Sequence, residues 1–194
     1  MMSLFNNLRM PAKIGLITAV LGAVMIALIS YISTRMASLD TAYSDIVGRI
    51  DTSTTLVART ARRAETYRAA AFELLVETTD AGNARLLKVT VESSEKVLEV
   101  LNTVKKNMPE KAVDLERQIE QFTKAFSACK PVVQYASTTT TAEDNAKAAE
   151  RIRTECNGPL QEAVNSQLQL AETMVAFAKS RADEQHTEIG RAHV

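Results

Sequence analysis

The chain has 194 residues, in which 23 basic side chains balance 23 acidic ones. This balance argues against a nucleic-acid-binding protein, because such proteins carry an excess of basic side chains that hold phosphates. Tryptophan is absent, glycine (6) and proline (4) are scarce, and Ala, Glu, Lys, Leu, Arg and Thr dominate after the first 35 residues. Such a composition indicates long helices and an all-α fold.

Residues 14–34 form an unbroken run of uncharged, mostly apolar side chains between Lys13 and Arg35. A helix needs about 20 such residues to cross the hydrocarbon core of a bilayer. Arg9 and Lys13 precede the run, so the positive-inside rule places the short arm of residues 1–13 in the cytoplasm and everything after Arg35 on the far side. A cleaved signal peptide is the alternative, but its apolar core is usually only about 7–15 residues long. The sequence favours an uncleaved transmembrane helix.

A heptad pattern follows directly after this run, in alternating steps of three and four residues. Its positions are Met36, Leu39, Tyr43, Ile46, Ile50, Ser53, Val57, Thr60, Ala64, Tyr67, Ala71 and Leu74. Such a seam requires a helix that packs lengthwise against partners. We expect one helix to run from the membrane to about Thr78, and two copies of the chain to form a homodimer through it.

After a short turn, a second helix is predicted at about residues 83–106. Pro109 suits the first turn of a third helix, and Asn107 with Glu110 has the spacing of a capping box. Pro131 lies inside the apolar pattern of this third helix and should bend it or end it early.

The fourth helix is expected to begin near Ala142, where Thr140 and Glu143 again have capping-box spacing. The Asn-Gly-Pro sequence at 157–159 predicts a kink rather than a turn. Helices joined by connections this short are antiparallel neighbours. Residues 35–187 are therefore predicted to form an up-down-up-down four-helix bundle.

The last seven residues, 188–194, have no visible relation to the preceding helical pattern. Their sequence, EIGRAHV, resembles the in-frame translation of a common sequencing adapter. We expect this tail to be non-native, exclude it from functional reasoning, and expect the biological protein to continue past Thr187.

Both cysteines, Cys129 and Cys156, fall on core-facing positions of the third and fourth helices, at similar distances from their connection. An antiparallel pair would bring them to similar heights, where a disulfide could stabilise the hairpin by about 3 kcal/mol. The alternative is two buried free thiols. We expect no metal site, because two cysteines without a third ligand are too few.

Catalysis finds no support in the sequence. It contains no nucleophile paired with a base, no glycine loop that could hold a phosphate and no metal-ligand cluster. His186, which precedes the tail, is expected to be a solvated surface residue. We expect no enzyme activity, no catalytic residue and no cofactor.

Four arginines of the first helix are candidate ligand-binding residues: Arg59, Arg62, Arg63 and Arg68. In the heptad frame, Arg63 is at a g position and Arg68 at the following e position, and these face each other across a parallel dimer. Like charges there are unfavourable unless an anion lies between them, so a small anionic ligand could bind at the dimer interface. Alternatively, Glu65 pairs with Arg62 and Arg68 at i,i+3 spacing and all of these side chains are solvated.

The basic arm, membrane helix, extracytoplasmic four-helix bundle and expected return to the membrane resemble the sensory half of a bacterial methyl-accepting chemotaxis receptor. Residues 7–16, NLRMPAKIGL, are also similar to the opening of many such transducers. In the family's amino-acid sensors, first-helix arginines of both subunits hold ligand carboxylates. Arg63 and Arg68 match that placement and one spacing, whereas Arg59 and Arg62 are offset.

The resemblance implies a receptor in the bacterial inner membrane, with a cytoplasmic N-terminus and a periplasmic bundle. A ligand would shift the last helix and thereby control a cytoplasmic kinase through a coupling protein, both reached through the part expected beyond Thr187. Alternatively, the same sensor module belongs to a histidine kinase or a cyclic-dinucleotide enzyme, or the chain is a membrane-anchored coiled-coil adaptor without a ligand.

Overall fold

A computed structural model describes residues 10–192, and this part of the chain consists of helices joined by short turns, without strands. The chain divides into two compact units, Met1–Asp45 and Ile46–Val194. Most of the predicted cytoplasmic arm, residues 1–9, lies outside the described residues.

Helix α2 (Met10–Ser44) contains the apolar run of the first unit. Every side chain from position 14 to position 34 is exposed, which is unfavourable in water for so long an apolar surface. The hydroxyls of Thr18 and Thr34 donate hydrogen bonds to the carbonyl oxygens of Ile14 (2.9 Å) and Ser30 (2.7 Å), so these hydroxyls need no water. Among the described helices, only the one that contains this run passes a membrane-span test of length and composition.

A π-helical segment (η1, Asp45–Asp51) contains the boundary between the two units in the sequence and leads into α3 (Thr52–Glu73). The predicted seam is buried from Ile50 onward, at all of its positions through Leu74. The chain leaves the helix after Glu73, slightly earlier than the predicted end.

Helix α4 (Asp80–Asn107) is capped by Thr79, whose hydroxyl accepts a hydrogen bond from the Gly82 amide (3.1 Å). A 3-10 turn (η2, Pro109–Lys111) then leads into α5 (Ala112–Ala136). Pro109 begins this helical turn, which agrees with its predicted place at the start of the third helix.

The predicted capping box of Asn107 and Glu110 is wrong. Met108 takes the cap position of the 3-10 turn and makes no side-chain cap bond. Glu110 instead accepts a 2.8 Å bond from Arg49 Nη1, which also donates to the Asn107 carbonyl oxygen at 2.9 Å. The Glu110 carboxylate therefore pairs with Arg49, which is distant in the sequence, and does not cap the backbone as the local spacing predicted.

Pro131 does not end α5 early, since the helix continues to Ala136. Both Pro131 and Ser127, whose carbonyl would accept the missing amide bond, are exposed. Water can therefore replace the lost helical hydrogen bond.

The last helical segment consists of α6 (Ala142–Arg151), a π-helical stretch (η3, Ile152–Cys156) and α7 (Asn157–Ala192). The chain makes no turn at the Asn-Gly-Pro sequence. The π-helical stretch directly precedes this sequence. Pro159 has no backbone N–H, so it cannot make the regular helical hydrogen bond to the residue four positions earlier.

The cap of α6 lies one residue later than predicted. Thr141, not Thr140, accepts the bond from the Asp144 amide (3.2 Å), and its hydroxyl donates to Asp144 Oδ2 (2.8 Å). The backbone of α7 continues to Ala192, while the side chains of the predicted tail, 188–194, lie outside the described residues.

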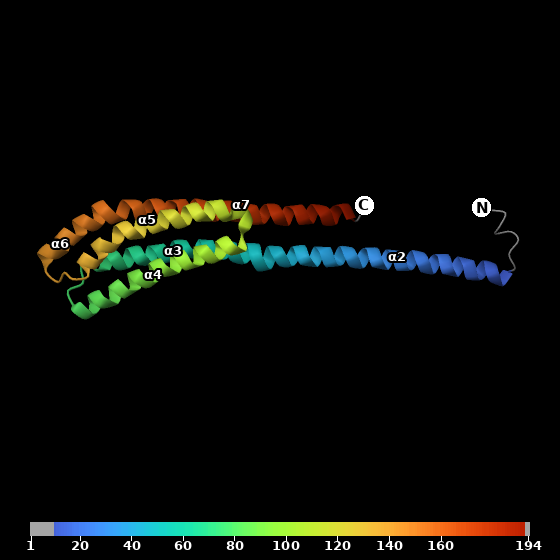
Figure 1. The fold of residues 1–194 in the computed structure, drawn as a ribbon, viewed down its shortest axis with the longest axis horizontal. Helices are drawn as coiled ribbons and strands as arrows, with labels where there is room; N and C mark the ends of the chain where they lie inside the picture. Colours follow the sequence, from blue (N-terminus) through green and yellow to red (C-terminus); the bar gives the residue numbers. More distant parts are fainter. Residues whose placement is uncertain (1–9, 193–194) are drawn as a thin grey trace. The chain divides into compact units, whose positions relative to one another are not determined.

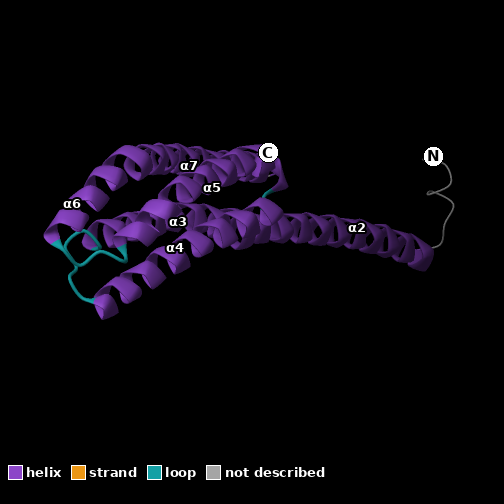
Figure 2. Cartoon of the chain, turned by 60° about the vertical axis from the view of Figure 1, so that its left-hand side comes forward, coloured by secondary structure: helices purple, strands orange, loops and turns teal. Residues whose placement is uncertain are grey.

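Within the second unit, α3 packs against α4 and α7, and α5 packs against the same two helices. Figures 1 and 2 both show these helices running side by side. One core runs between them, and its largest fully buried apolar side chains include Phe122, Leu74, Leu101, Met174 and Leu160.

Candidate functional site

The structure places the candidate arginines of α3 in different surroundings. Arg68 Nε donates to Glu65 Oε2 at 2.9 Å, and its Nη1 donates to Gln161 Oε1 of α7 at 2.8 Å. Part of the intrahelical alternative therefore holds, because Glu65 pairs with Arg68. The remaining arginine of that alternative, Arg62, is exposed, and no ion pair joins it to Glu65 among the described residues.

Arg59 and Arg63 line a groove of about 280 Å³ between α3 and α4. The other lining residues are Leu56, Thr60, Lys96, Glu99, Val100 and Thr103. Lys96 and Glu99 neutralise each other across 2.7 Å, so the two guanidinium groups leave the groove positive. Arg63 and Arg68 thus do not share a site within one chain.

A larger cavity, of about 320 Å³, opens between α4 and α5, with Tyr67 of α3 among its lining residues. Its apolar lining residues are Leu87, Val91, Leu98, Phe126 and Val133. The rings of Tyr67 and Phe126 lie 4.9 Å apart between centroids, at a tilt of 49°. The cavity therefore contains a rigid aromatic pair that suits an apolar or aromatic group.

Tyr67 is 3% exposed, and its hydroxyl is not among the fully buried polar atoms that lack a hydrogen-bond partner in the described part of the chain. Buried tyrosine hydroxyls usually have a partner. Burial also raises the pKa of Tyr67 far above its usual range, so the phenol stays protonated and can donate. The lining of the cavity therefore includes a protonated phenol.

The remaining lining residues are polar. They are Thr90, Ser94, Thr123, Ser127, Gln134, Glu95 and Lys130. Sequence reasoning missed this site, because its lining comes from three helices; Val91, one of the lining residues, is 46% exposed. The hydroxyls of Thr90 and Ser94 on either side of it were the available signal.

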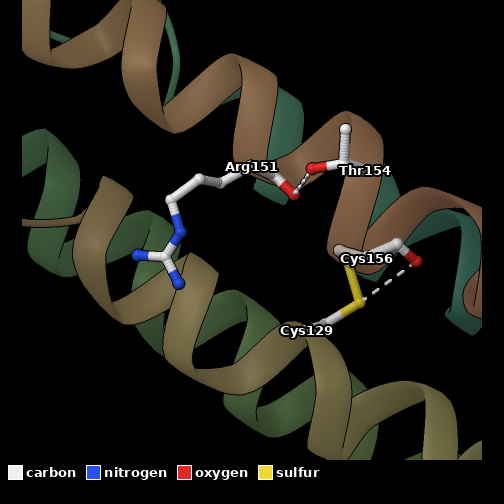
Figure 3. The surroundings of a disulfide bond; sticks show 4 residues. All are labelled: Cys129, Arg151, Thr154 and Cys156. Carbon is white, nitrogen blue, oxygen red and sulfur yellow. Dashed lines mark hydrogen bonds between the residues drawn. A yellow bond between two sulfur atoms is a disulfide. The ribbon is translucent and has the colours of Figure 1, made fainter.

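Cys129 of α5 and Cys156 at the end of η3 form a disulfide, with their Cα atoms 4.5 Å apart. Figure 3 shows the bond crossing from α5 to the π-helical stretch, near Arg151 and Thr154. The Thr154 hydroxyl donates to the carbonyl oxygen of Glu150 (2.8 Å), which supports the backbone where regular helical bonding is interrupted. The disulfide thus joins two helices at the irregular point of one of them.

Within the described residues, no group of three or more His, Cys, Asp and Glu side chains could hold a metal ion. His186 is exposed on α7. The absence of catalytic residues and cofactors stays a prediction.

Comparison of the chain with family models, with curated proteins and with solved structures gave no match.

Proposed function

We propose that this chain is the sensory part of a transmembrane chemoreceptor of the methyl-accepting type, anchored in the bacterial inner membrane by α2. The observation that carries the proposal is the exposed apolar surface of positions 14–34. In the sequence, this surface precedes a unit that has a hydrophobic core of its own. A lipid bilayer is the partner that such a surface requires.

The second unit is proposed to be an up-down-up-down four-helix bundle on the periplasmic side. The pairing of α3 with α4, α4 with α5, α5 with α7, and α7 with α3 supports this topology, since it closes a ring of neighbours. The disulfide between Cys129 and Cys156 supports a periplasmic location, because such bonds persist outside the reducing cytosol. Arg9 and Lys13 support a cytoplasmic N-terminus.

Two copies are proposed to pair through the first helix. Met36 and Tyr43, two positions of the heptad seam, are 66% and 68% exposed in the single chain and are available for such a contact. A small anionic ligand is proposed to bind at the arginines of α3. Because Arg68 is engaged with Gln161, Arg59 and Arg63 are the better candidates.

Signalling in this proposal is a shift between two packings of α3 and α7. A ligand that prefers one packing shifts the equilibrium by its difference in affinity for the two states. A small displacement of α7 would then pass through the membrane to a cytoplasmic kinase and its coupling protein.

Two experiments test the proposal. The first replaces Lys124, an exposed residue of α5, with cysteine in a Cys129→Ser, Cys156→Ser background. A membrane-impermeant maleimide should label this cysteine in intact cells. Labelling only after lysis would overturn the periplasmic assignment.

The second experiment fuses residues 1–187 to the second membrane helix and signalling region of a characterised chemoreceptor, in cells without receptors of their own. Amino acids and organic acids are added outside while kinase activity is recorded. A ligand-dependent change is expected, and it should be absent when α2 is replaced by an unrelated membrane helix out of register. A fusion that stays silent although its kinase is active would count against sensing.

A further inference from the structure

The turn between α4 and α5, residues 107–111, contacts both the first and the last helix of the second unit. Arg49 of η1 contacts this turn from one side, and Phe177 of α7 contacts it from the other. Figure 1 shows the turn, in yellow-green, between the ribbons of the first helix and α7. All of these residues belong to the second unit.

Arg49 joins the first helix to both ends of the 107–111 turn. Its Nη1 donates to the carbonyl oxygen of Asn107, the last residue of α4, at 2.9 Å and to Glu110 Oε1 at 2.8 Å. The last carbonyl groups of a helix have no partner within the helix, and a cation there also interacts favourably with the helix dipole. The side chains of Arg49 and Glu110 are each 31% exposed, so water screens this ion pair only in part.

Lys111 joins the same turn to the last helix. Its Nζ lies 5.3 Å from the ring centroid of Phe177 in α7, which is within the range of a cation–π interaction. Both side chains are partly buried, and such interactions strengthen when water is excluded. Glu110 and Lys111 are adjacent in the sequence, so a single peptide unit links the contact with the first helix to the contact with the last.

The backbone of the turn is firmly held between these two contacts. The side chain of Met108 is fully buried. Its amide donates to the Val104 carbonyl oxygen (2.8 Å), and its carbonyl oxygen accepts from the Lys111 amide (3.0 Å). Pro109, which lies between these residues, has one fixed backbone dihedral. A displacement on one side of the turn is therefore passed to the other side.

We propose that the 107–111 turn is a conformational latch that couples the first helix to the last. A displacement of α7 along α3 must either separate Phe177 from Lys111 or pull the turn away from Arg49. With both contacts intact, the latch stabilises the packing of α3 and α7 that the structure shows. The inference rests on the proposed function in one respect only, which is that α7 carries the signal.

A coupling of this kind is reciprocal. Loss of the contact with the first helix should loosen α7, and loss of the contact with α7 should loosen the first helix. A turn that only fills the space between the helices predicts a different result, in which each loss loosens its own side alone. Local opening of the two helices therefore distinguishes a latch from a passive turn.

The test measures hydrogen–deuterium exchange by mass spectrometry on the whole chain in lipid nanodiscs. Glu110→Gln removes the charge that pairs with Arg49, and exchange should rise about fivefold at residues 174–181 of α7. Lys111→Gln removes the charge over the Phe177 ring, and exchange should rise by a similar factor in η1.

Two variants of exposed residues are the matched controls. Lys106→Gln removes a lysine in the last turn of α4, and Glu120→Gln removes a glutamate of α5 that pairs with Lys124 in its own helix. Neither should change exchange in η1 or at residues 174–181. Residues 83–90, near the opposite end of α4, report a general loss of stability and should exchange at the wild-type rate in every variant.

Exchange that rises only on the side of the altered charge would overturn the coupling, as would no change in either helix or an equal rise at residues 83–90. In the receptor fusion of residues 1–187, Glu110→Gln and Lys111→Gln should shift the basal kinase activity in the same direction. Reciprocal changes in exchange, together with a basal activity equal to that of the wild type, would refute only the role of α7 in signalling.

Discussion

Gln167 Nε2 of α7 donates a 2.7 Å hydrogen bond to the carbonyl oxygen of Val57 in α3. The same amide nitrogen also bonds the hydroxyl of Thr60. Gln167 is fully buried, and its Oε1 has no partner among the described residues. This polar link fixes the register of the two helices whose packing the proposed sensor must change, and it does so at the cost of one unpaired acceptor.

Replacing Gln167 should therefore affect stability according to the size of the new side chain. Gln167→Leu removes the unpaired oxygen of Gln167. It leaves neither Val57 nor Thr60 without a partner, because the Thr60 hydroxyl still donates to the Val57 carbonyl oxygen. Its free energy of unfolding should stay within about 1 kcal/mol of the wild type. Gln167→Ala leaves a cavity and should cost about 2 kcal/mol. Thermal unfolding of the whole chain in detergent distinguishes the two, and equal losses would contradict this account.

Reduction of the disulfide should lower stability measurably. The bond between Cys129 and Cys156 closes a loop with a sequence separation of 27, for which loop-closure entropy gives about 3–4 kcal/mol. The midpoint of thermal unfolding should fall when dithiothreitol is added. The double variant Cys129→Ala, Cys156→Ala should already be less stable and should not respond to the reductant. A wild type that is indifferent to dithiothreitol would show that the bond contributes nothing.

Glu77 should make the turn before α4 sensitive to acid. Its Oε1 accepts bonds from the Thr79 hydroxyl (2.7 Å) and from the amides of Thr78 and Thr79 (2.9 Å each), which lower the pKa of the Glu77 carboxyl. Because the pKa is lower in the folded state, the contribution is complete above the range in which free glutamate titrates, about 4.3, and is lost as the pH falls through the folded-state value. The unfolding midpoint of Glu77→Gln should lie below that of the wild type at neutral pH, and the two should converge in acid.

Gly82 should couple to the same carboxylate. A Cβ atom at this position would overlap the carboxylate of Glu77, so Gly82→Ala must displace it from the Thr78 and Thr79 amides. Alanine is otherwise favoured over glycine in a helix by about 0.5–1 kcal/mol. Gly82→Ala should therefore stabilise the chain in a Glu77→Ala background and do so less, or not at all, in the wild type. Additive effects in a double-mutant cycle would show that the two positions are independent.

The parts of the fold that the sequence predicted depend on local pattern. The heptad steps from Ile50 to Leu74 identify the buried face of α3, because a repeat of that length fits only one face of a helix. The parts that it did not predict depend on residues far apart in the chain. Glu110 does not cap the helix as expected, because it pairs with Arg49, which is 61 positions away in the sequence. The cavity at Tyr67 likewise requires three helices to be placed before its lining can be recognised.

The seam of the first unit offers a direct test of the proposed homodimer. Tyr43 is at an a position of the heptad and is 68% exposed in the single chain, whereas Thr41 is at an f position on the opposite side of the helix. In membranes under mild oxidation, Tyr43→Cys should form a disulfide-linked dimer, because a positions of two parallel helices lie next to each other. Thr41→Cys is the matched control and should remain monomeric on a non-reducing gel. Equal cross-linking at both positions would indicate random collision and would contradict pairing through this seam.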